Sequence, residues 1–543
     1  ALPISYKMSG HVNAILSKRH RVLAKVTKMP TSRKVEMAGQ QVEVNNPDGE
    51  MTYFPLHDES SNFYADAEDM NDCTLAKLDG SEGDWMMYEP FYWSKGINDY
   101  LNNKKYACYS SYPEDEMPPV PEATVLTLDT IKETQGGWLG ERKIMSGKPT
   151  LMESYTTDKA YSVCKVDVSG YRRVRFPSVP GTGLIGSVFV DDAGNILKSI
   201  VVPTIGLKFE AGMYLIADVP ERATALHFSI LNTAEFDCVV LSHSGKIEDM
   251  EPDWVANEEH LCAVVGSSEV GSKLRSCITG GSTAGGMSWT DFHFYSQQRG
   301  MQQIDALMHS RIANLFFARY GRRNSQEECG AGYHSHMRTT GGTAEHGMED
   351  TIGYDAAHAI DPNVTNAMVE DLVHQYAWYR SRDEYGQESV TRVNNICCLG
   401  YEDIYGHKYD MMDGVDVPND SGNVGKWRIW MPDGTVRMVP GKGSSGQWTA
   451  GVAHGRYMDV VPVGTLSGSS STYYGDVYWF SGAALRVVCR GCNDANAHGG
   501  VSNAYASYDA SHASAHIGSR LAFRGKIVRA QSVAAYKAIR EVA

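Results

Sequence analysis

A block of 24 residues near the end of the chain, residues 493–516, sets the strongest limit on how this chain folds. It consists of Ala, Ser, Asn, His, Asp, Tyr and Gly with one Val, and it lacks Leu, Ile, Phe, Met, Trp and Pro. Apolar and Arg-Gly-rich segments frame it on both sides, at Arg486–Cys492 and Ile517–Gly525. A scaffold therefore has to hold the block, and its expected members are Val487, Val488, Ile517, Leu521 and Phe523.

The composition of the block has a chemical and a genetic interpretation. Tyr gives a large, stiff contact, and Ser and Asn give short donors and acceptors, as in adaptable binding loops. Asn, Asp, His, Tyr, Ser, Ala and Gly are all reached from an Asn codon when its two adenines change and the third base stays a pyrimidine. Lys, Glu, Gln, Met and Trp cannot be reached in this way. The block is thus a predicted target of adenine-directed mutagenesis; a low-complexity loop is the alternative.

Side chains can be exchanged freely only where they point out of a stiff scaffold. The block is therefore predicted to present the ligand-binding side chains, and its Ala residues are expected at small inward or spacer positions. The predicted ligand-binding residues are Asn493, Asp494, Asn496, His498, Asn503, Tyr505, Ser507, Tyr508, Asp509, His512, Ser514 and His516.

Two motifs resemble a known family. The frame RVVCRG…IGSRLAFRG resembles the end of the C-type lectin-like variable proteins of diversity-generating retroelements. Upstream, GYEDIYGHKYDMMDGV (Gly400–Val415) is similar to the motif G-L-E-D-x-x-G-N-V-x-E-W-x-D-G of the formylglycine-generating-enzyme branch of that fold. The resemblance covers about residues 250–530, half of the chain.

The resemblance implies an α+β C-type lectin-like domain over residues 250–543 with a variable region at 493–516. It implies a phage tail-fibre or tail-tip receptor-binding protein that attaches to a bacterial surface receptor, either glycan or protein. Other phage tail proteins and two further copies in a homotrimer are the expected partners. Such a protein is made in the bacterial cytoplasm and ends in the virion. The alternatives are a formylglycine-generating-type or glycan-cleaving tail enzyme, and a variable protein on the bacterial cell surface.

The whole chain is predicted to be a β-rich multidomain protein. Residues 1–117 are expected to form a β-rich domain for tail attachment and oligomerisation, with a hairpin turn at Asn46–Gly49. The aromatic segment Asp84–Trp93 is interpreted as buried core or subunit interface, with a sugar-stacking platform as the alternative, and the acidic, Pro-rich residues 113–122 as a linker. Residues 123–246 carry closely spaced strand patterns, which predict a jelly-roll-like β-sandwich. Whether that sandwich binds carbohydrate stays open.

The last domain shows two helical patterns and several hairpins. Apolar residues at i, i+3, i+4 and i+8 predict a helix over Asp305–Tyr320, which Gly321 ends. A second helix is expected over Val364–Arg380, after the start signal Asp361-Pro362. Hairpins are expected at Asp191–Asn195 in the sandwich and at Pro432–Gly434 here.

Composition excludes several classes of function. The formal net charge of −15, with no long basic run, argues against nucleic acid and an anionic membrane as partners. No signal peptide is evident, and no apolar run approaches the roughly 18 residues of a membrane span. The 11 cysteines in so long a chain do not form a disulfide framework.

Each group of residues that could be catalytic or could bind a metal also has an interpretation without such a function. Cys489 and Cys492 form a C-x-x-C, but Cys489 reads as a buried strand residue. The carboxylates of Glu402, Asp403, Asp410 and Asp413 are interpreted as bracing a loop, with calcium as the open alternative. Cys329 with His334, His336 and His346 is a zinc candidate against a loop of solvated histidines. Phe523-Arg524-Gly525 stands where the enzyme branch has Phe-Arg-Cys. No catalytic residue, metal or cofactor is predicted, and the chain is predicted not to be an enzyme.

Overall fold

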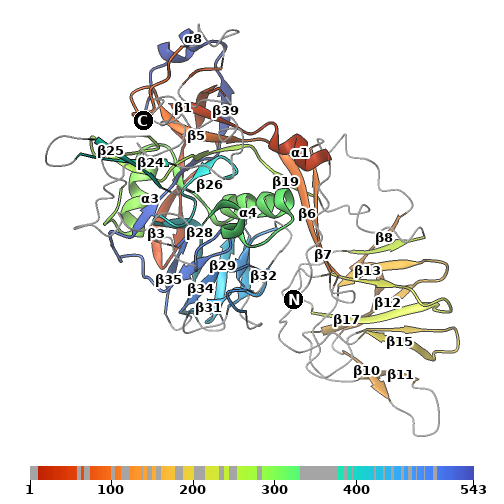
Figure 1. Cartoon of the computed structure of the whole chain (residues 1–543). Helices are drawn as coiled ribbons and strands as arrows, with labels where there is room; N and C mark the ends of the chain where they lie inside the picture. The colour runs from red at the N-terminus through yellow and green to blue at the C-terminus, as the bar shows by residue number, and fades with distance from the viewer. Residues whose placement is uncertain are drawn as a thin grey trace. The chain divides into compact units, whose positions relative to one another are not determined.

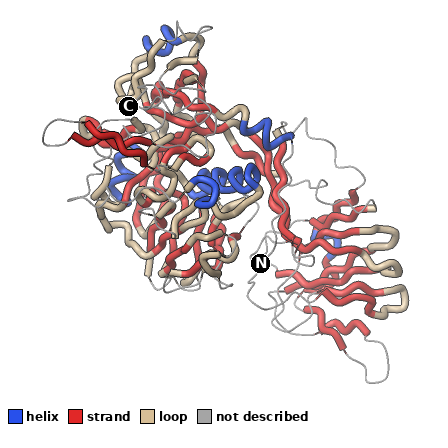
Figure 2. The backbone as a smooth tube through the Cα atoms, viewed as in Figure 1, coloured by secondary structure: helices blue, strands red, loops and turns tan. Residues whose placement is uncertain are grey.

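The chain is β-rich and divides into two compact units in the computed structural model (Figures 1 and 2). The first unit comprises Ala1–Lys7, Trp93–Ala256 and His454–Met458, and the second comprises Met8–Tyr92, Asn257–Ala453 and Asp459–Ala543. The structure describes residues 10–57, 63–65, 74–99, 104–111, 123–135, 138–142, 150–154, 161–177, 187–200, 214–231, 238–243, 254–277, 284–330, 377–382, 388–393, 396–420, 423–431, 435–441, 446–453, 458–462, 468–471, 474–481, 484–492 and 498–543.

The first unit contains two antiparallel sheets over one apolar core. One sheet has the order β15-β14-β17-β12-β9 and the other β16-β13-β18-β8. The strands are β8 (Ala123–Thr127), β9 (Lys132–Gln135), β12 (Tyr161–Asp167), β13 (Arg173–Pro177), β14 (Ser187–Val190), β15 (Ile196–Ile200), β16 (Tyr214–Asp218), β17 (Ala225–Leu231) and β18 (Cys238–Ser242).

Inward side chains from both sheets fill this core, among them Cys164 and Phe228 from one sheet and Phe176 and Leu241 from the other. Successive strands alternate between the two sheets, except for β9 with β12 and for the hairpin of β14 with β15, which each stay within one sheet. This architecture matches the β-sandwich predicted for 123–246. The hairpin predicted at Asp191–Asn195 is also present, since β14 pairs with β15.

The second unit contains a seven-stranded sheet that joins the two ends of the chain. Its order is β23-β38-β20-β5-β1-β4-β39. The strands are β1 (His20–Lys28), β4 (Glu50–Pro55), β5 (Asp84–Glu89), β20 (His260–Ala263), β23 (Gln302–Gln303), β38 (Leu521–Phe523) and β39 (Lys526–Arg529). The prediction of a separate domain over residues 1–117 is therefore wrong. Strands from its first part pair with strands that come hundreds of residues later, and turn and linker patterns in the sequence give no sign of such pairing.

The aromatic segment Asp84–Trp93 lies mostly in β5, inside this sheet. Trp85 and Met86 are fully buried, and the Arg21 guanidinium lies 4.9 Å from the Trp85 ring centroid. The burial of these side chains agrees with the buried-core interpretation of the segment.

An eight-stranded sheet carries the end of the variable block. Its order is β30-β29-β28-β35-β36-β34-β31, and β37 pairs with β28 outside that path. The strands are β28 (Tyr409–Val417), β29 (Lys426–Trp430), β30 (Val436–Pro440), β31 (Gln447–Trp448), β34 (Val477–Phe480), β35 (Arg486–Arg490), β36 (Ala504–Ala506) and β37 (Ile517–Ser519). The pairing of β29 with β30 fits the hairpin expected around Pro432–Gly434.

Two main helices pack near this sheet. The helix α4 (Ala306–Tyr320) confirms the first helical prediction: Asp305 caps its N-terminus and Gly321, at φ +63°, ends it. The helix α3 (Trp289–Gln298) begins with a capping box between Ser288 and Asp291, and it was not predicted. Most of the second predicted helix, Val364–Arg380, lies outside the described residues. Its last part is not helical, because Ala377–Arg382 is the strand β24.

The other elements are short. The helices are α1 (Gly10–Leu16), α2 (Leu128–Ile131), α5 (Ser325–Cys329) and α8 (Val533–Ala538). The strands, grouped as they pair, are β2 (Ser32–Met37) with β3 (Gln40–Asn45); β19 (Val255–Asn257), β6 (Tyr92–Asp99) and β7 (Lys104–Ser110); β10 (Trp138–Arg142) with β11 (Thr150–Ser154); β21 (Ser268–Val270) with β22 (Lys273–Arg275); β24 with β25 (Glu388–Val393); β26 (Cys397–Cys398) with β27 (Tyr401–Glu402); and β32 (Val452–Ala453) with β33 (Val461–Pro462). The hairpin predicted at Asn46–Gly49 is wrong, because β3 pairs with β2 and β4 pairs with β1.

The frame strand β38 is expected to stabilise the second unit strongly. Phe523→Ala removes a ring that is 1% exposed and is expected to lower the free energy of unfolding by about 3–5 kcal/mol. Phe294→Ala is the matched control, since that ring is 56% exposed and its loss is expected to cost less than about 0.5 kcal/mol. Urea unfolding followed by tryptophan fluorescence measures both. Equal effects of the two substitutions would contradict the buried frame.

Candidate functional site

The two frames of the variable block lie on either side of one strand. Asp410 and Met411 of β28 pair with Arg490 and Cys489 of β35 in antiparallel register. The same segment pairs in parallel with β37, where Tyr409 lies opposite Ile517. The start and the end of the block are thereby fixed to the same strand. The five predicted scaffold residues, Val487, Val488, Ile517, Leu521 and Phe523, are all buried.

Inside the block, the strand β36 pairs with β35 on one side and β34 on the other. Ala504 and Ala506 are fully buried, and Tyr505 between them is half-buried. This alternation agrees with the expected inward role of the Ala residues at these two positions and at Ala510. Ala513 is exposed, so the inward role does not hold for every Ala in the block.

The predicted ligand-binding residues fall into three groups. Asn493, Asp494 and Asn496 lie outside the described residues. Asp509 is exposed, and the following residues are partly exposed: His498, Tyr505, Ser507, Tyr508, His512, Ser514 and His516. Asn503 is fully buried, which contradicts its predicted role. Its side-chain amide donates to the carbonyl oxygens of Val477 at 2.6 Å and His498 at 3.1 Å, so it holds the block to β34.

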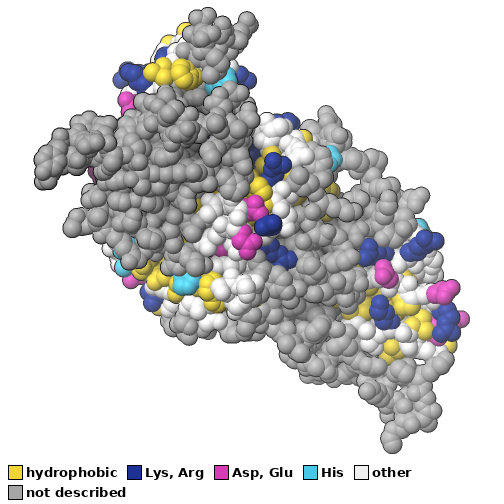
Figure 3. Space-filling view, in the orientation of Figure 1, with side chains coloured by type: hydrophobic (Ala, Val, Ile, Leu, Met, Phe, Trp, Pro, Cys, Tyr) yellow, Lys and Arg dark blue, Asp and Glu magenta, His cyan; other side chains and the backbone are white. Residues whose placement is uncertain are grey.

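Six rings form a continuous group on this part of the second unit, which we name the aromatic row: Trp448, His498, Trp479, Tyr505, Tyr508 and His512. Neighbouring ring centroids lie 5.1 Å (Trp448–His498), 5.7 Å (His498–Trp479), 5.5 Å (Trp479–Tyr505), 4.5 Å (Tyr505–Tyr508) and 3.9 Å (Tyr508–His512) apart. All six side chains are partly exposed. Figure 3 shows hydrophobic and histidine side chains next to each other at the lower edge of this unit, where Figure 1 draws β31, β34 and β35.

The electrostatics of the row follow from what lies beneath it. The buried Tyr409 ring lies 5.0 Å from Tyr505. Burial, together with a hydrogen bond to Tyr505, raises the pKa of Tyr508 well above its usual value, so this phenol stays neutral at physiological pH. The row therefore offers apolar contact with few fixed charges.

The sequence analysis missed Trp448 and Trp479, which lie in β31 and β34 outside the block. The sequence contained a signal that Trp479 is exposed, because alternate residues of a strand face opposite sides. Its neighbours Tyr478 and Phe480 are buried and Trp479 faces the other way. Four consecutive apolar residues, Val477–Phe480, hid that alternation.

The carboxylates of the Gly400–Val415 motif each have partners inside the fold. The Glu402 carboxylate lies 3.0 Å from the Arg21 guanidinium, and Asp410 accepts a hydrogen bond from Arg520 at 3.1 Å. Asp413 accepts from His293 at 3.1 Å. The bracing interpretation agrees with these contacts. Across the described ranges, no three His, Cys, Asp or Glu residues come together as metal ligands would.

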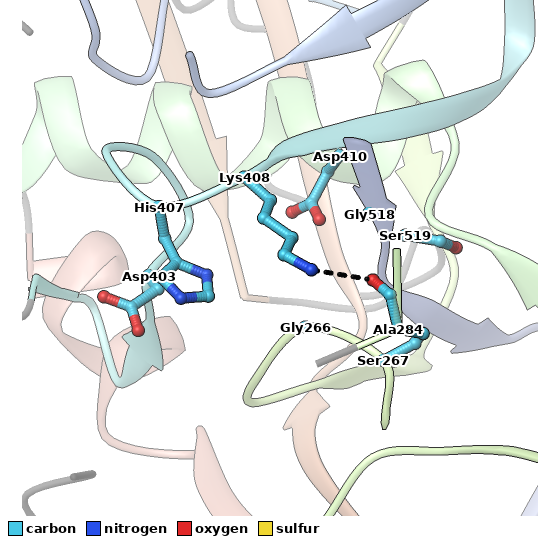
Figure 4. A pocket seen from close by; sticks show the side chains of 9 residues that line it. All are labelled: Gly266, Ser267, Ala284, Asp403, His407, Lys408, Asp410, Gly518 and Ser519. Atoms are coloured by element: carbon cyan, nitrogen blue, oxygen red, sulfur yellow. Dashed lines mark hydrogen bonds between the residues drawn. The ribbon is translucent and has the colours of Figure 1, made fainter. Parts of the chain in front are cut away.

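A small pocket lies beside the exit of the block (Figure 4). Its lining is Gly266, Ser267, Ala284, Asp403, His407, Lys408, Asp410, Gly518 and Ser519, and it has room for about one water molecule. The Lys408 ammonium donates to the Ala284 carbonyl at 3.3 Å, and burial lowers the pKa of Lys408 to about 8. A Cβ on Gly285 would lie 2.6 Å from this ammonium, so a larger residue there would displace the end of the Lys408 side chain. The size of the pocket fits bracing better than binding of a substrate.

The C-x-x-C thiols are buried. Cys489 lies in β35, as predicted, with its Sγ 3.4 Å from the Met411 sulfur, and the Cys492 Sγ lies 3.7 Å from the Tyr409 hydroxyl. Both cysteines are free. Burial raises the pKa of Cys489 far above its usual value, and a neutral thiol in apolar surroundings is a poor nucleophile. Of the zinc candidates, Cys329 is buried at the end of α5, and His334, His336 and His346 lie outside the described residues.

No family model matches the sequence, and no curated protein is similar to it. Within the ranges that the structure describes, every helix is too short or too polar to cross a lipid bilayer.

Asn503 and Ser507 are predicted to respond differently to truncation. Asn503→Ala removes the buried hydrogen bond to Val477 and the part-buried one to His498, so it is expected to cost about 1–3 kcal/mol of unfolding free energy. Ser507→Ala, at a partly exposed neighbouring position, is expected to cost less than about 0.5 kcal/mol. Urea denaturation of both variants tests this. A neutral Asn503→Ala would restore Asn503 to the ligand-facing group.

The pair of His293 and Asp413 is expected to make stability depend on pH. Burial alone would lower the pKa of His293, but the Asp413 carboxylate raises it to about 9. A histidine whose pKa is higher in the folded state stabilises fully below its unfolded pKa of about 6.5, and this stabilisation is lost as the pH rises through 9. We expect a loss of roughly 1–3 kcal/mol between pH 6.5 and 9. Stability measured across this range should fall less steeply for His293→Asn; an unchanged slope would contradict the assignment.

Proposed function

We propose that this chain is a hypervariable ligand-binding protein whose variable residues are carried by a C-type lectin-like fold in the second unit. The bounds 250–543 predicted for that domain are too narrow, because Met8–Tyr92 belongs to the same unit and contributes β1, β4 and β5 to its sheet. More particularly, the chain is proposed to be a phage tail-fibre or tail-tip receptor-binding protein, diversified by a retroelement, that attaches to a bacterial surface receptor. The observation that carries the proposal is the block 493–516. Its composition is that of mutated Asn codons, and its two frames are fixed to the same strand, β28.

The geometry supports this proposal because most of the described block side chains can change without loss of the scaffold. The scaffold is made by the frames and by the buried Ala504 and Ala506, whereas Tyr505, Tyr508 and His512 lie partly exposed. A binding site that is diversified needs this separation between residues that fold and residues that bind.

The proposed C-type lectin-like fold has support from the order of elements. Two helices, α3 and α4, precede several non-contiguous strands, and the described part of the block, with the short strand β36, comes near the end. This is the order expected from the resemblance of the Gly400–Val415 motif and of the frames.

A binding role is favoured over catalysis by the state of the thiols. The enzyme branch that the chain resembles uses cysteines near the chain end, but here Cys489 and Cys492 are buried and Arg524 is followed by glycine. Arg524 pairs with Asp305 at 2.9 Å, the residue that caps α4, which is a structural role.

The proposal includes a homotrimer whose variable faces engage together. A site that is continually diversified cannot be optimised for one target, so each copy is expected to bind weakly. Linked copies raise the overall affinity by about 10²–10⁴ when the geometry lets them bind at the same time.

The genomic neighbourhood of the gene tests the class directly. We expect a near-copy of the segment that encodes residues 486–525, with adenines at the variable codons, beside a reverse-transcriptase gene. Neighbouring tail genes would distinguish the phage protein from a bacterial surface protein. A locus with neither a near-copy nor a reverse transcriptase would overturn the diversification.

Binding is expected to depend on the exposed tyrosines. Tyr508→Ala is expected to lower adsorption of the chain to cells of the strain that carries the gene cluster by at least about tenfold, as loss of a central aromatic contact does. The ring is half-buried, so the variant is expected to stay folded with a cost of about 1–2 kcal/mol. Ser511→Ala is the control, at an exposed position outside the predicted set. Unchanged adsorption of the Tyr508 variant would contradict the assigned face.

A further inference from the structure

The aromatic row extends beyond the variable block. Trp479 in β34 lies directly opposite Tyr505 of the block in the parallel pairing of β34 with β36. Trp448 in β31 lies opposite Val477 of β34, and its ring is 5.1 Å from that of His498. His498 contacts both indoles, so two residues outside the block and two inside it form one surface.

Glycines lie directly against both tryptophans. A Cβ on Gly446 would lie 2.7 Å from the Trp479 indole nitrogen, and a Cβ on Gly468 would lie 2.8 Å from the Trp448 carbonyl oxygen and 3.0 Å from the Trp448 Cβ. A larger residue at Gly446 would displace the Trp479 indole, and one at Gly468 would displace the Trp448 backbone. The adjacent strand residues Tyr478 and Phe480 are buried on the opposite face, so the direction of the partly exposed Trp479 is set by the strand itself.

The two tryptophans differ from the rest of the row in how they can vary. The single Trp codon, TGG, contains no adenine, so a process that alters adenines leaves Trp448 and Trp479 unchanged. His498, Tyr505, Tyr508 and His512 all belong to residue types that mutated Asn codons produce. The row thus combines a constant part and a variable part.

We propose that Trp448 and Trp479 are the constant floor of the ligand-binding site, and that this floor takes an apolar or aromatic side chain of a protein partner. The inference rests on the proposed function and deepens it by naming two further binding residues and the class of ligand. In that site the constant floor supplies apolar contact for any target, and the variable rings around it select among targets.

The ring geometry favours a protein over a glycan as the partner. The rings around the indoles are tilted to one another, by 76° for Trp448–His498, 67° for Trp479–His498 and 44° for Trp479–Tyr505. Rings that are tilted in this way do not form the single flat platform on which a sugar ring stacks best, and they present faces and edges in several directions to an apolar or aromatic side chain. Trp and Tyr are also the residues that contribute most at the centres of protein–protein interfaces.

Libraries of the full-length chain on the yeast surface test this inference. The codons of the partly exposed and exposed predicted positions, such as His498 and Tyr505, are randomised in three backgrounds. These are the native chain, the double variant Trp448→Leu/Trp479→Leu, which retains apolar bulk without the rings, and the control Phe294→Ala. Each library is selected on immobilised lysozyme and on immobilised dextran, at matched display levels.

The native and Phe294→Ala libraries are expected to give lysozyme binders at equal frequency, and the double leucine library at least tenfold fewer. Equal recovery from the native and leucine libraries on lysozyme overturns the constant floor. Loss of recovery that is confined to dextran assigns the floor to sugars and overturns the protein partner. Failure of every library to give binders on either surface overturns the proposed function itself, and the inference with it. Thermal melting of the unrandomised leucine variant, expected to stay cooperative, separates loss of the floor from loss of the fold.

Discussion

The buried guanidinium of Arg520 is the interaction on which the variable-block architecture depends. It lies at the exit of the block, fully buried, and donates to Asp410 and to the carbonyl oxygens of Ala263, Val264, Glu402 and Asp403. A buried charge is costly unless each of its donors and acceptors is satisfied. All five partners must therefore be in place together, which ties β20, β28 and the loop after Tyr401 to the frame of the block.

Because of this arrangement, the fold around the block is determined mainly by residues outside the block. The seven-stranded sheet contributes β20 and β38, the eight-stranded sheet contributes β28, and both share one apolar core with α3. The burial of Asp410 raises its pKa, and the Arg520 guanidinium offsets part of that effect. The carboxylates of the Gly400–Val415 motif thus have a structural role: they fix the position at which the end of the block joins the scaffold.

Features that depend on neighbouring residues were predicted from the sequence, whereas pairings between distant segments were not. The helix α4 followed from its apolar spacing, the Asp305 cap and Gly321, all within one segment. The pairing of β5 with β20 and of β4 with β39 could not be predicted, since contacts between strands hundreds of residues apart leave no pattern within either segment. The same limit explains the wrong hairpin at Asn46–Gly49: the turn residues were read correctly as a break, but each flanking strand found another partner.

The candidate site was predicted in outline from the codon pattern and its frames, but the pattern cannot separate exposed from buried positions. Asn503 has the same composition signature as its neighbours, yet it is buried and bonded to β34. Trp448 and Trp479 carry no such signature and still belong to the aromatic row. Burial and ring contacts come from the folded sheet, so only the structure assigns them.

Asn503 also shows what diversification costs a protein of this kind. Under the proposed function, adenine-directed mutagenesis changes codons without regard to burial, so some variants replace a buried hydrogen-bonding side chain such as that of Asn503. Each such change costs about 1–3 kcal/mol, a large fraction of the 5–15 kcal/mol that stabilises a typical domain. A scaffold near the stability threshold would lose the fold in many variants. The two frames on β28 and the five-partner contact of Arg520 lie outside the block, so their stabilisation is the same in every variant. That constancy is what permits a single scaffold to tolerate a changing surface.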